Sequence, residues 1–356
     1  MTKARALSVK DKNAFFATEV IERRKPRADD VVIDIDYCGV CHSDLHCARG
    51  EWPGSLYPCV PGHEIIGRVV ETGTDVARFK VGQRVGVGCM VDSCGVCDSC
   101  LAGLEQYCYN GNTGTYNSPD VHLGGHTFGG YSTSVVVDQR FVLSIPDTLP
   151  SDAAAPLLCA GITLFSPLKH WRAGPGKRVA IVGLGGLGHM GVKLARAMGA
   201  TVVVITTSPA KAEDAFRLGA HEVLVSTNPD EMAKAERTLD LILNTVSAVH
   251  DYNAFMRLLR IDGAQVLLGI PPSELAGPHV MRMVANRLTL AASTIGGIAE
   301  TQEMLDFCAQ HAIVSDIEII GASQIETAWQ RMVQGDVRYR FVLDTKTIVG
   351  EPSLSS

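Results

Sequence analysis

The densest group of reactive side chains in the sequence is a loop of four cysteines. The run CGVCDSCLAGLEQYC (94–108) spaces Cys94, Cys97, Cys100 and Cys108 as C-x2-C-x2-C-x7-C. Four thiolates this close together can surround one zinc ion with Zn–S bonds of about 2.3 Å, which fills the tetrahedron and leaves no position for a substrate. Iron–sulfur clusters also take four cysteines, but this spacing and the absence of a Cys-Pro ending favour zinc. The loop is therefore predicted to hold a structural zinc ion.

A second set of possible metal ligands is spread from residue 41 to residue 159. Cys41 lies in the stretch YCGVCHSDLHCARG (37–50), His63 and Glu64 lie in PGHE, and Cys159 lies in PLLCAG. Two thiolates and one imidazole leave the fourth position of a zinc ion open for water or substrate, as in a catalytic site. A lone cysteine in an apolar segment, such as Cys159, is more often a packing residue. Both interpretations stay open at this point.

A glycine-rich segment indicates a dinucleotide site. The sequence GLGGLG (183–188) has the G-x-G-x-x-G pattern and lies between an expected strand, RVAIVGL, and an expected helix. In this pattern Gly183 forms the tight turn, Gly185 lets a pyrophosphate approach the backbone, and Gly188 allows close packing of helix and strand. The alternative is a tight turn that binds nothing. The flanking elements favour a cofactor loop made of Gly183, Leu184, Gly185, Gly186, Leu187 and Gly188.

The residues after the next strand indicate which cofactor is preferred. NAD-binding proteins usually carry an acidic residue there to hold the ribose 2′-hydroxyl. Here the strand ends in Thr206, Thr207 and Ser208, and Lys211 follows. Hydroxyls and a cation can bind a 2′-phosphate, so NADP(H) is favoured over NAD(H). The alternative is a solvated loop with an ordinary surface lysine.

Bulk composition is that of a globular enzyme. The chain has 356 residues, of which 46% are hydrophobic and 20% charged, and its net charge is −6. This length predicts two domains, and the absence of a basic block argues against nucleic-acid binding. No stretch has the length and apolarity of a signal peptide or a membrane span, which predicts a cytoplasmic protein with no membrane partner. Eleven cysteines in such a chain favour thiols and metal ligands over disulfides.

Two patterns of secondary structure follow each other along the chain. Residues 28–150 contain short apolar runs broken by glycine and proline, which predict a β-rich, barrel-like module. A helix is expected from 151, with Ser151 as its N-cap and Pro167 interrupting or kinking it. Continuous apolar strands, among them AQVLLGI (264–270) and RLTLAASTI (287–295), then alternate with helices up to about residue 297, which predicts a doubly wound parallel sheet. The final segment has too few strands for a domain and is expected to pack on the first module.

Several motifs together resemble one family. CHSDLH, PGHEIIGRV, the four-cysteine loop, GLGGLGHMGVK and IGGIAETQEMLDFC are similar to the zinc-dependent medium-chain alcohol dehydrogenases. The resemblance covers nearly the whole chain and is strongest to the cinnamyl-alcohol-dehydrogenase branch and its bacterial broad-range NADP-dependent aldehyde reductases. It implies an α/β chain with a GroES-like β-rich catalytic zinc domain, 1–156 with 298–356, and a doubly wound Rossmann dinucleotide-binding domain, 157–297.

The resemblance also implies roles for individual residues. Cys41, His63 and Cys159 match the catalytic zinc ligands, and Glu64 matches a carboxylate that can approach the metal. Ser43 and His46 match a proton relay from substrate to solvent. Further positions match cofactor contacts, namely His42, Thr163, Thr245, Gly269, Ser293, Thr294 and Ile295. Positions near the substrate pocket of relatives are Trp52, Cys89 and Tyr116.

The implied reaction is the interconversion of primary alcohols and aldehydes, aromatic or aliphatic, with NADP(H) and two zinc ions per chain. Relatives often carry two basic residues after the hydroxyl cluster, whereas Ala212 follows Lys211 here, so the 2′-phosphate is expected to be held less tightly. A homodimer is expected through the strand at 287–295. Two alternatives are a polyol dehydrogenase of the same superfamily and a cofactor-binding regulator without catalysis. No role in this scheme follows for Cys38, Cys47, Cys59 and Cys308; Cys47 is expected to border the cleft, and the other three are expected to be small buried hydrophobic residues.

Overall fold

The computed structural model describes residues 1–271 and 276–349 and divides the chain into two compact units. Unit 1 consists of residues 1–159 and 296–356, and unit 2 consists of residues 160–295. The expected boundary after residue 156 assigned Cys159 to the dinucleotide-binding domain. It belongs instead to unit 1, together with Cys41 and His63, so all the candidate metal ligands lie in one unit.

Unit 1 is built on a mainly antiparallel sheet with the order β16-β17-β3-β4-β5-β9, and β8 pairs with β3 outside that order. Only β16 and β17 run parallel, and β17 pairs antiparallel with β3. The C-terminal segment is thus part of the same sheet as the N-terminal module. The strands are β3 (Asp30–Gly39), β4 (Ile65–Thr72), β5 (Arg84–Val87), β8 (Ser134–Asp138), β9 (Val142–Ser144), β16 (Ile317–Ile320) and β17 (Arg340–Asp344).

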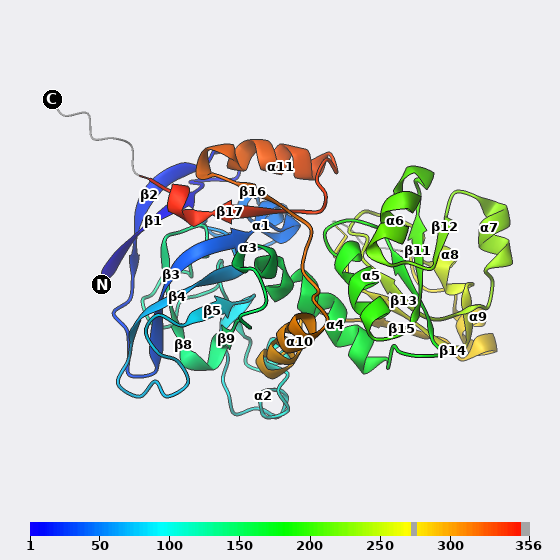
Figure 1. Ribbon diagram of the computed structural model, residues 1–356, viewed down its shortest axis with the longest axis horizontal. Coiled ribbons are helices and arrows are strands. Elements are labelled where there is room, and N and C mark those ends of the chain that lie inside the picture. The colour runs from blue at the N-terminus through cyan, green and yellow to red at the C-terminus, as the bar shows by residue number, and fades with distance from the viewer. Residues whose placement is uncertain (272–275, 350–356) are drawn as a thin grey trace. The chain divides into compact units, whose positions relative to one another are not determined.

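Two smaller sheets and five short or medium helices complete unit 1 in the part of the chain that the structure describes. Figure 1 shows α11 lying over β16 and β17, where Arg331 donates to Glu318 at 2.8 Å. The smaller sheets are β1 (Thr2–Ser8) with β2 (Ala17–Arg23) and β6 (Met90–Asp92) with β7 (Thr113–Gly114). The helices are α1 (His42–Ala48), α2 (Asp98–Leu101), α3 (Ser151–Ala154), α10 (Ile298–Gln310) and α11 (Ile325–Val333).

The helical segment after residue 150 differs from the expectation. Pro150 and not Ser151 is the N-cap of α3, and the chain continues as a 3₁₀ turn over Ala155–Leu158. The break falls at Cys159, before α4 (Ala160–His170) begins, whereas Pro167 lies inside α4 without ending it. The predicted N-cap was wrong, and the break at Cys159 was not predicted. A proline is easy to recognise in a sequence, whereas a change of backbone angles at a cysteine is not.

Unit 2 is a doubly wound α/β unit, as predicted. Its six strands are all parallel and have the order β12-β11-β10-β13-β14-β15. The order reverses between β10 and β13, which is where dinucleotides bind in such sheets. The strands are β10 (Arg178–Val182), β11 (Thr201–Thr206), β12 (Glu222–Val225), β13 (Leu239–Asn244), β14 (Leu259–Leu267) and β15 (Thr289–Ala292). The helices after α4 are α5 (Gly188–Ala197), α6 (Ala212–Leu218), α7 (Pro229–Lys234), α8 (Asn253–Met256) and α9 (Val280–Asn286).

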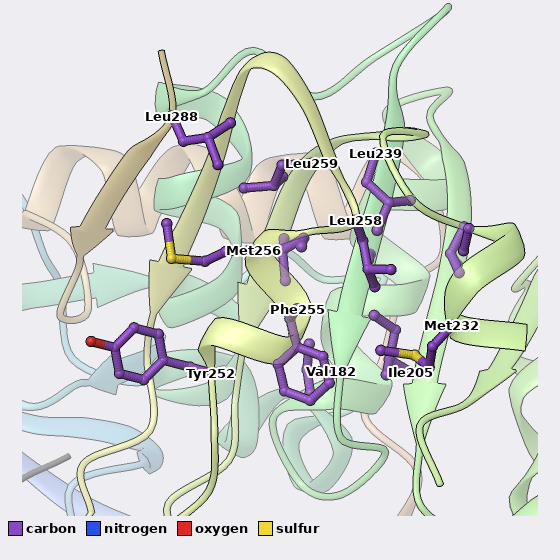
Figure 2. Packing of buried hydrophobic residues seen from close by; sticks show 14 residues of the cluster. Val182, Ile205, Met232, Leu239, Tyr252, Phe255, Met256, Leu258, Leu259 and Leu288 are labelled. Carbon is purple, nitrogen blue, oxygen red and sulfur yellow. The ribbon is translucent and has the colours of Figure 1, made fainter. Parts of the chain in front are cut away.

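The core on one side of this sheet explains why the strands are continuously apolar. Figure 2 shows Val182 of β10, Ile205 of β11, and Met256 and Leu258 from the α8 region as members of one cluster of buried hydrophobic side chains. These four side chains are at most 3% exposed. Burying one such side chain stabilises the fold by about 1.5–3 kcal/mol, so a polar residue at any of these positions would be costly.

Two strand lengths differ from the prediction. β14 begins at Leu259, earlier than the expected start at residue 264. The prediction placed the start too late because Asp262 and Gly263 look like a turn in the sequence. Asp262 does adopt a positive φ of 66°, and the pairing register shifts near this point. β15 covers only Thr289–Ala292 of the expected strand at 287–295.

Among the described residues no single helix is long and apolar enough to cross a membrane. One bent pair of helical segments, Ser151–Leu158 with Ala160–His170, has the length and composition of a span when the two are taken together.

Candidate metal centres and cofactor loop

The dispersed candidate ligands meet at one place in unit 1. Cys41, His63, Glu64 and Cys159 each offer a ligand atom, and these atoms all lie within 4.8 Å of one another. Cys41 is the N-cap of α1, His63 and Glu64 lead into β4, and Cys159 occupies the break before α4. We call these four residues the buried cluster, because all except the half-buried Cys41 are buried.

The aspartate Asp44 connects two parts of the buried cluster. Its carboxylate is fully buried and accepts hydrogen bonds from the backbone N–H of Cys41 and of Gly62, both at 2.9 Å. It also lies 3.0 Å from Nδ1 of His63. When Nδ1 donates to this carboxylate, Nε2 is left free to bind a metal. The sequence interpretation missed Asp44, although its place three residues after an N-cap was a signal for capping.

The charges inside the buried cluster shift the protonation of its members. Burial alone would lower the pKa of His63, but the carboxylate of Asp44 and the neighbouring thiols raise it well above its usual value. The hydrogen bond with Cys159 lowers the pKa of Cys41 well below its usual value, and the same contact raises the pKa of Cys159. One thiolate is thus already favoured without a cation, and a cation is needed to stabilise the second. A set of two sulfurs and one imidazole suits zinc.

The carboxylate of Glu64 is held by an arginine from β17. Nη2 of Arg340 donates to both oxygens of Glu64, at 2.6 and 2.8 Å, and also to the carbonyl of Val40 at 2.9 Å. Burial raises the pKa of Glu64 to about 7, and Arg340 opposes that shift. Gly39 has no side chain in the space beside Glu64, where a Cβ would lie 1.8 Å from Oε2. Arg340 was missed because nothing near it in the sequence indicates a partner 276 residues away.

The four-cysteine loop forms the other candidate metal centre. The ligand atoms of Cys94, Cys97, Cys100 and Cys108 also lie within 4.8 Å of one another. The sulfurs of Cys94 and Cys100 are 3.9 Å apart, and those of Cys97 and Cys108 are 4.0 Å apart. A tetrahedron with Zn–S bonds of about 2.3 Å has edges of about 3.8 Å, so the sulfurs already have the spacing of a zinc site.

The expected relay residues Ser43 and His46 lie on α1, directly after Cys41. Ser43 is half-buried, and Nδ1 of His46 lies 2.5 Å from Oε2 of Glu51. The His46 ring is 5.3 Å from the ring of Trp52 and 6.1 Å from the ring of the exposed His42. Trp52 therefore lies beside His46, an expected relay residue. Glu51 was not among the residues singled out from the sequence.

The other two expected pocket residues lie beside the buried cluster. The ring of Tyr116 is 5.7 Å from that of His63, tilted by 33°. Cys89 hydrogen-bonds to the thiol of Cys159, and its sulfur is 3.8 Å from the carbonyl oxygen of Leu158. Among the cysteines without an expected role, Cys38, Cys47, Cys59 and Cys308 are all at most 3% exposed. Burial was expected of three of them, whereas Cys47 was expected to border the cleft.

The glycine loop of unit 2 has the geometry that the pattern requires. Gly183 has a φ of 89°, which few residues other than glycine adopt. A Cβ on Gly188 would lie 2.0 Å from the carbonyl oxygen of Gly183, so the first turn of α5 packs directly on the loop. A Cβ on Gly185 would meet nothing within 4 Å, so that side of the loop is open to a ligand.

Apart from His42 on α1, the residues expected to contact the rest of the cofactor belong to unit 2. Nζ of Lys211 donates to the carbonyl of Leu184 at 3.2 Å, which places its charge beside the glycine loop. Oγ1 of the buried Thr206 accepts from the backbone N–H of Ser208, and Thr207 is exposed. Thr245, Gly269 and the segment Ser293, Thr294 and Ile295 follow the carboxyl ends of β13, β14 and β15, and Thr163 is buried in α4.

Comparison with known proteins agrees with this geometry. Residues 27–147 match the alcohol dehydrogenase GroES-like domain, and residues 186–310 match the zinc-binding dehydrogenase family. The chain is 55% identical over 348 residues to aldehyde reductase YahK of Escherichia coli, which covers 96% of this chain and 99% of that protein. The chain belongs to the zinc-binding alcohol dehydrogenase family, with a GroES-like domain and a Rossmann domain.

Two solved structures place it more closely within that family. A cinnamyl alcohol dehydrogenase from Sorghum bicolor, SbCAD4, superimposes with a TM-score of 0.95 at 42% identity, over 99% of this chain and 100% of that one. The cinnamyl alcohol dehydrogenase of Helicobacter pylori, solved with NADP(H), has a TM-score of 0.91 at 38% identity, over 97% and 99% of the two chains. The resemblance to the cinnamyl-alcohol-dehydrogenase branch is thereby confirmed.

Proposed function

We propose that this protein is an oxidoreductase that interconverts primary alcohols and aldehydes with NADP(H), at a zinc ion held by Cys41, His63 and Cys159. The convergence of these three ligands, whose donor atoms lie within 4.8 Å of one another, carries the proposal. The names of the relatives support it, since they include an aldehyde reductase and cinnamyl alcohol dehydrogenases. The favoured direction in the proposal is aldehyde reduction.

The protein's own groups prepare the buried cluster for this chemistry. Zinc, when bound, supplies Lewis-acid polarisation of the substrate oxygen. Asp44 fixes the ring of His63 so that Nε2 points at the site, and it also fixes the backbone of Cys41. Arg340 binds both oxygens of Glu64 by two short hydrogen bonds, while Cys41, His63 and Cys159 would hold the zinc ion. Glu64 is assigned the role of a carboxylate that would approach the metal during exchange of ligands.

We assign proton transfer to the side chains of α1. In aldehyde reduction, His46 would take up a proton from solvent and the Ser43 hydroxyl would donate a proton to the substrate oxygen, and alcohol oxidation would use the same path in reverse. The close contact of Nδ1 of His46 with Glu51 fixes the orientation of the imidazole. A positioned acid–base group of this kind contributes about 10²- to 10⁴-fold in rate. His42 is assigned to the cofactor pyrophosphate.

The cofactor is assigned to unit 2, where it supplies or accepts a hydride when bound. The backbone of residues 183–188 and the first turn of α5 hold the pyrophosphate. Thr206, Thr207, Ser208 and Lys211 hold the 2′-phosphate, for which the lysine supplies the positive charge. The nicotinamide end is assigned to Thr163, Thr245, Gly269, Ser293, Thr294 and Ile295.

The second zinc ion is assigned to Cys94, Cys97, Cys100 and Cys108, which gives two zinc ions per chain. Protein sulfurs would fill all four positions of a tetrahedral ion in this site, so the ion would hold the loop and take no substrate. The substrate pocket is assigned to Trp52, Cys89 and Tyr116. Their aromatic and thiol side chains suit an aromatic or medium aliphatic aldehyde.

A homodimer through the edge of the unit 2 sheet is part of the proposal. β15 is the last strand of that sheet, and the nearby helix α9 exposes Val280, Met281 and Val284 by 63%, 74% and 73%. Exposed apolar residues beside an unpaired strand edge are usually covered in an assembly. Light scattering after size exclusion should give the mass of two chains, and a monomer at micromolar concentration would contradict this assignment. A cytoplasmic location is proposed as well.

One experiment tests the proposed activity. Purified protein is analysed for metal content and assayed with NADPH and NADH against aromatic aldehydes, aliphatic aldehydes and polyols. The expected result is two zinc ions per chain and oxidation of NADPH with aldehydes in preference to NADH. Full zinc content without turnover of any of these substrates would overturn the proposal.

A further inference from the structure

A buried arginine outside both metal centres makes an unusual set of contacts. Arg23 is the last residue of β2 and is 7% exposed. Its Nε donates to the carbonyl of Ser134 at 2.9 Å, and its Nη1 donates to the carbonyl of Phe128 at 2.6 Å. Its Nη2 donates to the carbonyl of Gly129 at 2.9 Å and to the hydroxyl of Ser132 at 2.7 Å. These four acceptors are three carbonyls and a hydroxyl.

The neighbouring arginine shows how different this is from an ordinary ion pair. Arg24 donates to both carboxylate oxygens of Asp30, each at 2.9 Å. Burial, and after it the charge of Arg24, lowers the pKa of Arg23 to about 10, so its guanidinium is still charged at neutral pH. A cation buried against neutral acceptors costs stability unless its hydrogen bonds are well satisfied. The hydrogen bonds of Arg23 therefore hold the segment 128–134 in place, and the position of that segment needs an explanation.

That segment, residues 128–134, lies directly against the chain that precedes His63. Three backbone N–H groups of this segment donate to backbone carbonyls of residues 60–62. Gly129 donates to the carbonyl of Val60 at 2.7 Å, Gly130 to the carbonyl of Gly62 at 2.8 Å, and Tyr131 to the carbonyl of Pro61 at 2.9 Å. The two segments are too close for any side chain between them. A Cβ on Gly129 would lie 2.4 Å from the carbonyl oxygens of both Pro61 and Gly62.

The same chain segment leads to the ligand of the proposed zinc site. The N–H of Gly62 donates to Oδ1 of Asp44, the oxygen that also lies 3.0 Å from Nδ1 of His63. A shift of residues 128–134 would thus move residues 60–62 and, through them, the imidazole. We propose that Arg23 is a positioning residue of the zinc site of the buried cluster, acting through residues 128–134, an inference that rests on the proposed function.

The test compares zinc release from the two centres of one protein. Purified, zinc-loaded Arg23→Lys and the milder Ser132→Ala are mixed with a chromophoric chelator, and the two release phases are assigned with Cys41→Ser and Cys94→Ser. Lysine keeps the charge but cannot reach all four acceptors, and alanine removes only one acceptor. Since groups that orient metal ligands typically change affinity by about 10- to 100-fold, we expect the lower end, about tenfold faster release from the buried cluster, for Arg23→Lys. Ser132→Ala should show a smaller change in the same direction.

The four-cysteine loop and Arg24 supply the controls. Zinc release from Cys94, Cys97, Cys100 and Cys108 should be unchanged in both variants. Arg24→Lys should lower the melting temperature without changing either release phase, because the carboxylate of its partner Asp30 is bound by Arg24 and Arg27, which lie outside residues 128–134. If Arg23→Lys only lowers the melting temperature and releases both zinc ions at the wild-type rates, the inference is overturned. If Arg23→Lys fails to fold, wild-type release rates in Ser132→Ala overturn the inference instead. Wild-type protein that holds zinc only in the loop would instead contradict the proposed function.

Discussion

The two candidate metal centres of unit 1 use the same kind of ligand in opposite ways. The four-cysteine loop takes all its ligands from residues 94–108, and two of its cysteines are only half-buried. The buried cluster takes its ligands from residues 41–159, and it is surrounded by Asp44 and by the pair of Arg340 with Glu64. The first centre is a property of one loop, and the second is a property of the whole module.

This difference has consequences for function. The sulfurs of the loop already have the spacing of a closed tetrahedron, so little room is left for another ligand. In the buried cluster the fourth donor, Glu64, is bound to Arg340. A centre that must keep one position available needs groups outside the ligand set to control that position, and such groups come from distant strands.

The largest effect is expected for loss of a ligand in the buried cluster. Cys41→Ser should lower kcat/KM for aldehyde reduction by at least about 10³-fold, because Lewis-acid catalysis contributes several kcal/mol and about 1.4 kcal/mol is a factor of ten. Metal analysis should show loss of one zinc ion. Cys94→Ser is the matched control, in which the zinc ion of the loop is lost and the other is kept. Equal loss of both ions in each variant would mean that the two centres are not independent.

A smaller effect is expected when the ligands are kept and only their support is changed. Asp44→Asn should weaken zinc binding in the buried cluster by about 10- to 100-fold, because an amide cannot accept as strongly from both Gly62 and His63. Competition with a chelator measures this. Asp98→Asn in the exposed first residue of α2 is the control and should change neither centre. Unchanged binding in Asp44→Asn would remove the proposed distinction between the two centres.

Removal of zinc should reveal a difference in thiol reactivity. Hydrogen bonds from the backbone N–H groups of Val96 and Cys97 lower the pKa of Cys94 to about 6, whereas the contact with Cys41 raises the pKa of Cys159 well above its usual value. The thiolate is the reactive form, so iodoacetamide at pH 7 should label Cys94 at least about tenfold faster than Cys159. The labelling rate of Cys94 should fall as the pH drops below about 6. Mass spectrometry of the labelled peptides tests this, and faster labelling of Cys159 would contradict it.

The smallest effect is expected for a change in unit 2, which should leave both metal centres intact. Lys211→Ala should raise KM for NADPH about fivefold, the factor that corresponds to about 1 kcal/mol, the upper value for a solvent-accessible ion pair, and leave KM for NADH unchanged. Steady-state kinetics with both cofactors measures this, and Lys234→Ala on α7 serves as the control. An equal change for NADH would contradict the assignment of Lys211 to the 2′-phosphate.

The parts that could be predicted are those whose signal is local. The loop of four cysteines, the glycine pattern and the alternation of apolar strands with helices each lie within a short stretch of sequence, and the structure has them. The failures are of two kinds. Ser151 as an N-cap was wrong, and of the two effects predicted for Pro167, an interruption or a kink, the interruption does not occur, because local preference does not decide where a helix breaks. Arg340 and Asp44 were missed because their partners lie far along the chain or on another loop.

The sequence by itself determined which atoms are available, namely the thiols, imidazoles and glycines and the order in which they occur. Only the tertiary structure decided that Cys159, in a break before α4, lies beside Cys41 and His63, and that β17 brings Arg340 to Glu64. The physical reason is that a zinc site in one loop needs only the local backbone to close. A site made from distant segments is held by pairing of strands and by buried hydrogen bonds, and these contacts exist only once the module has folded.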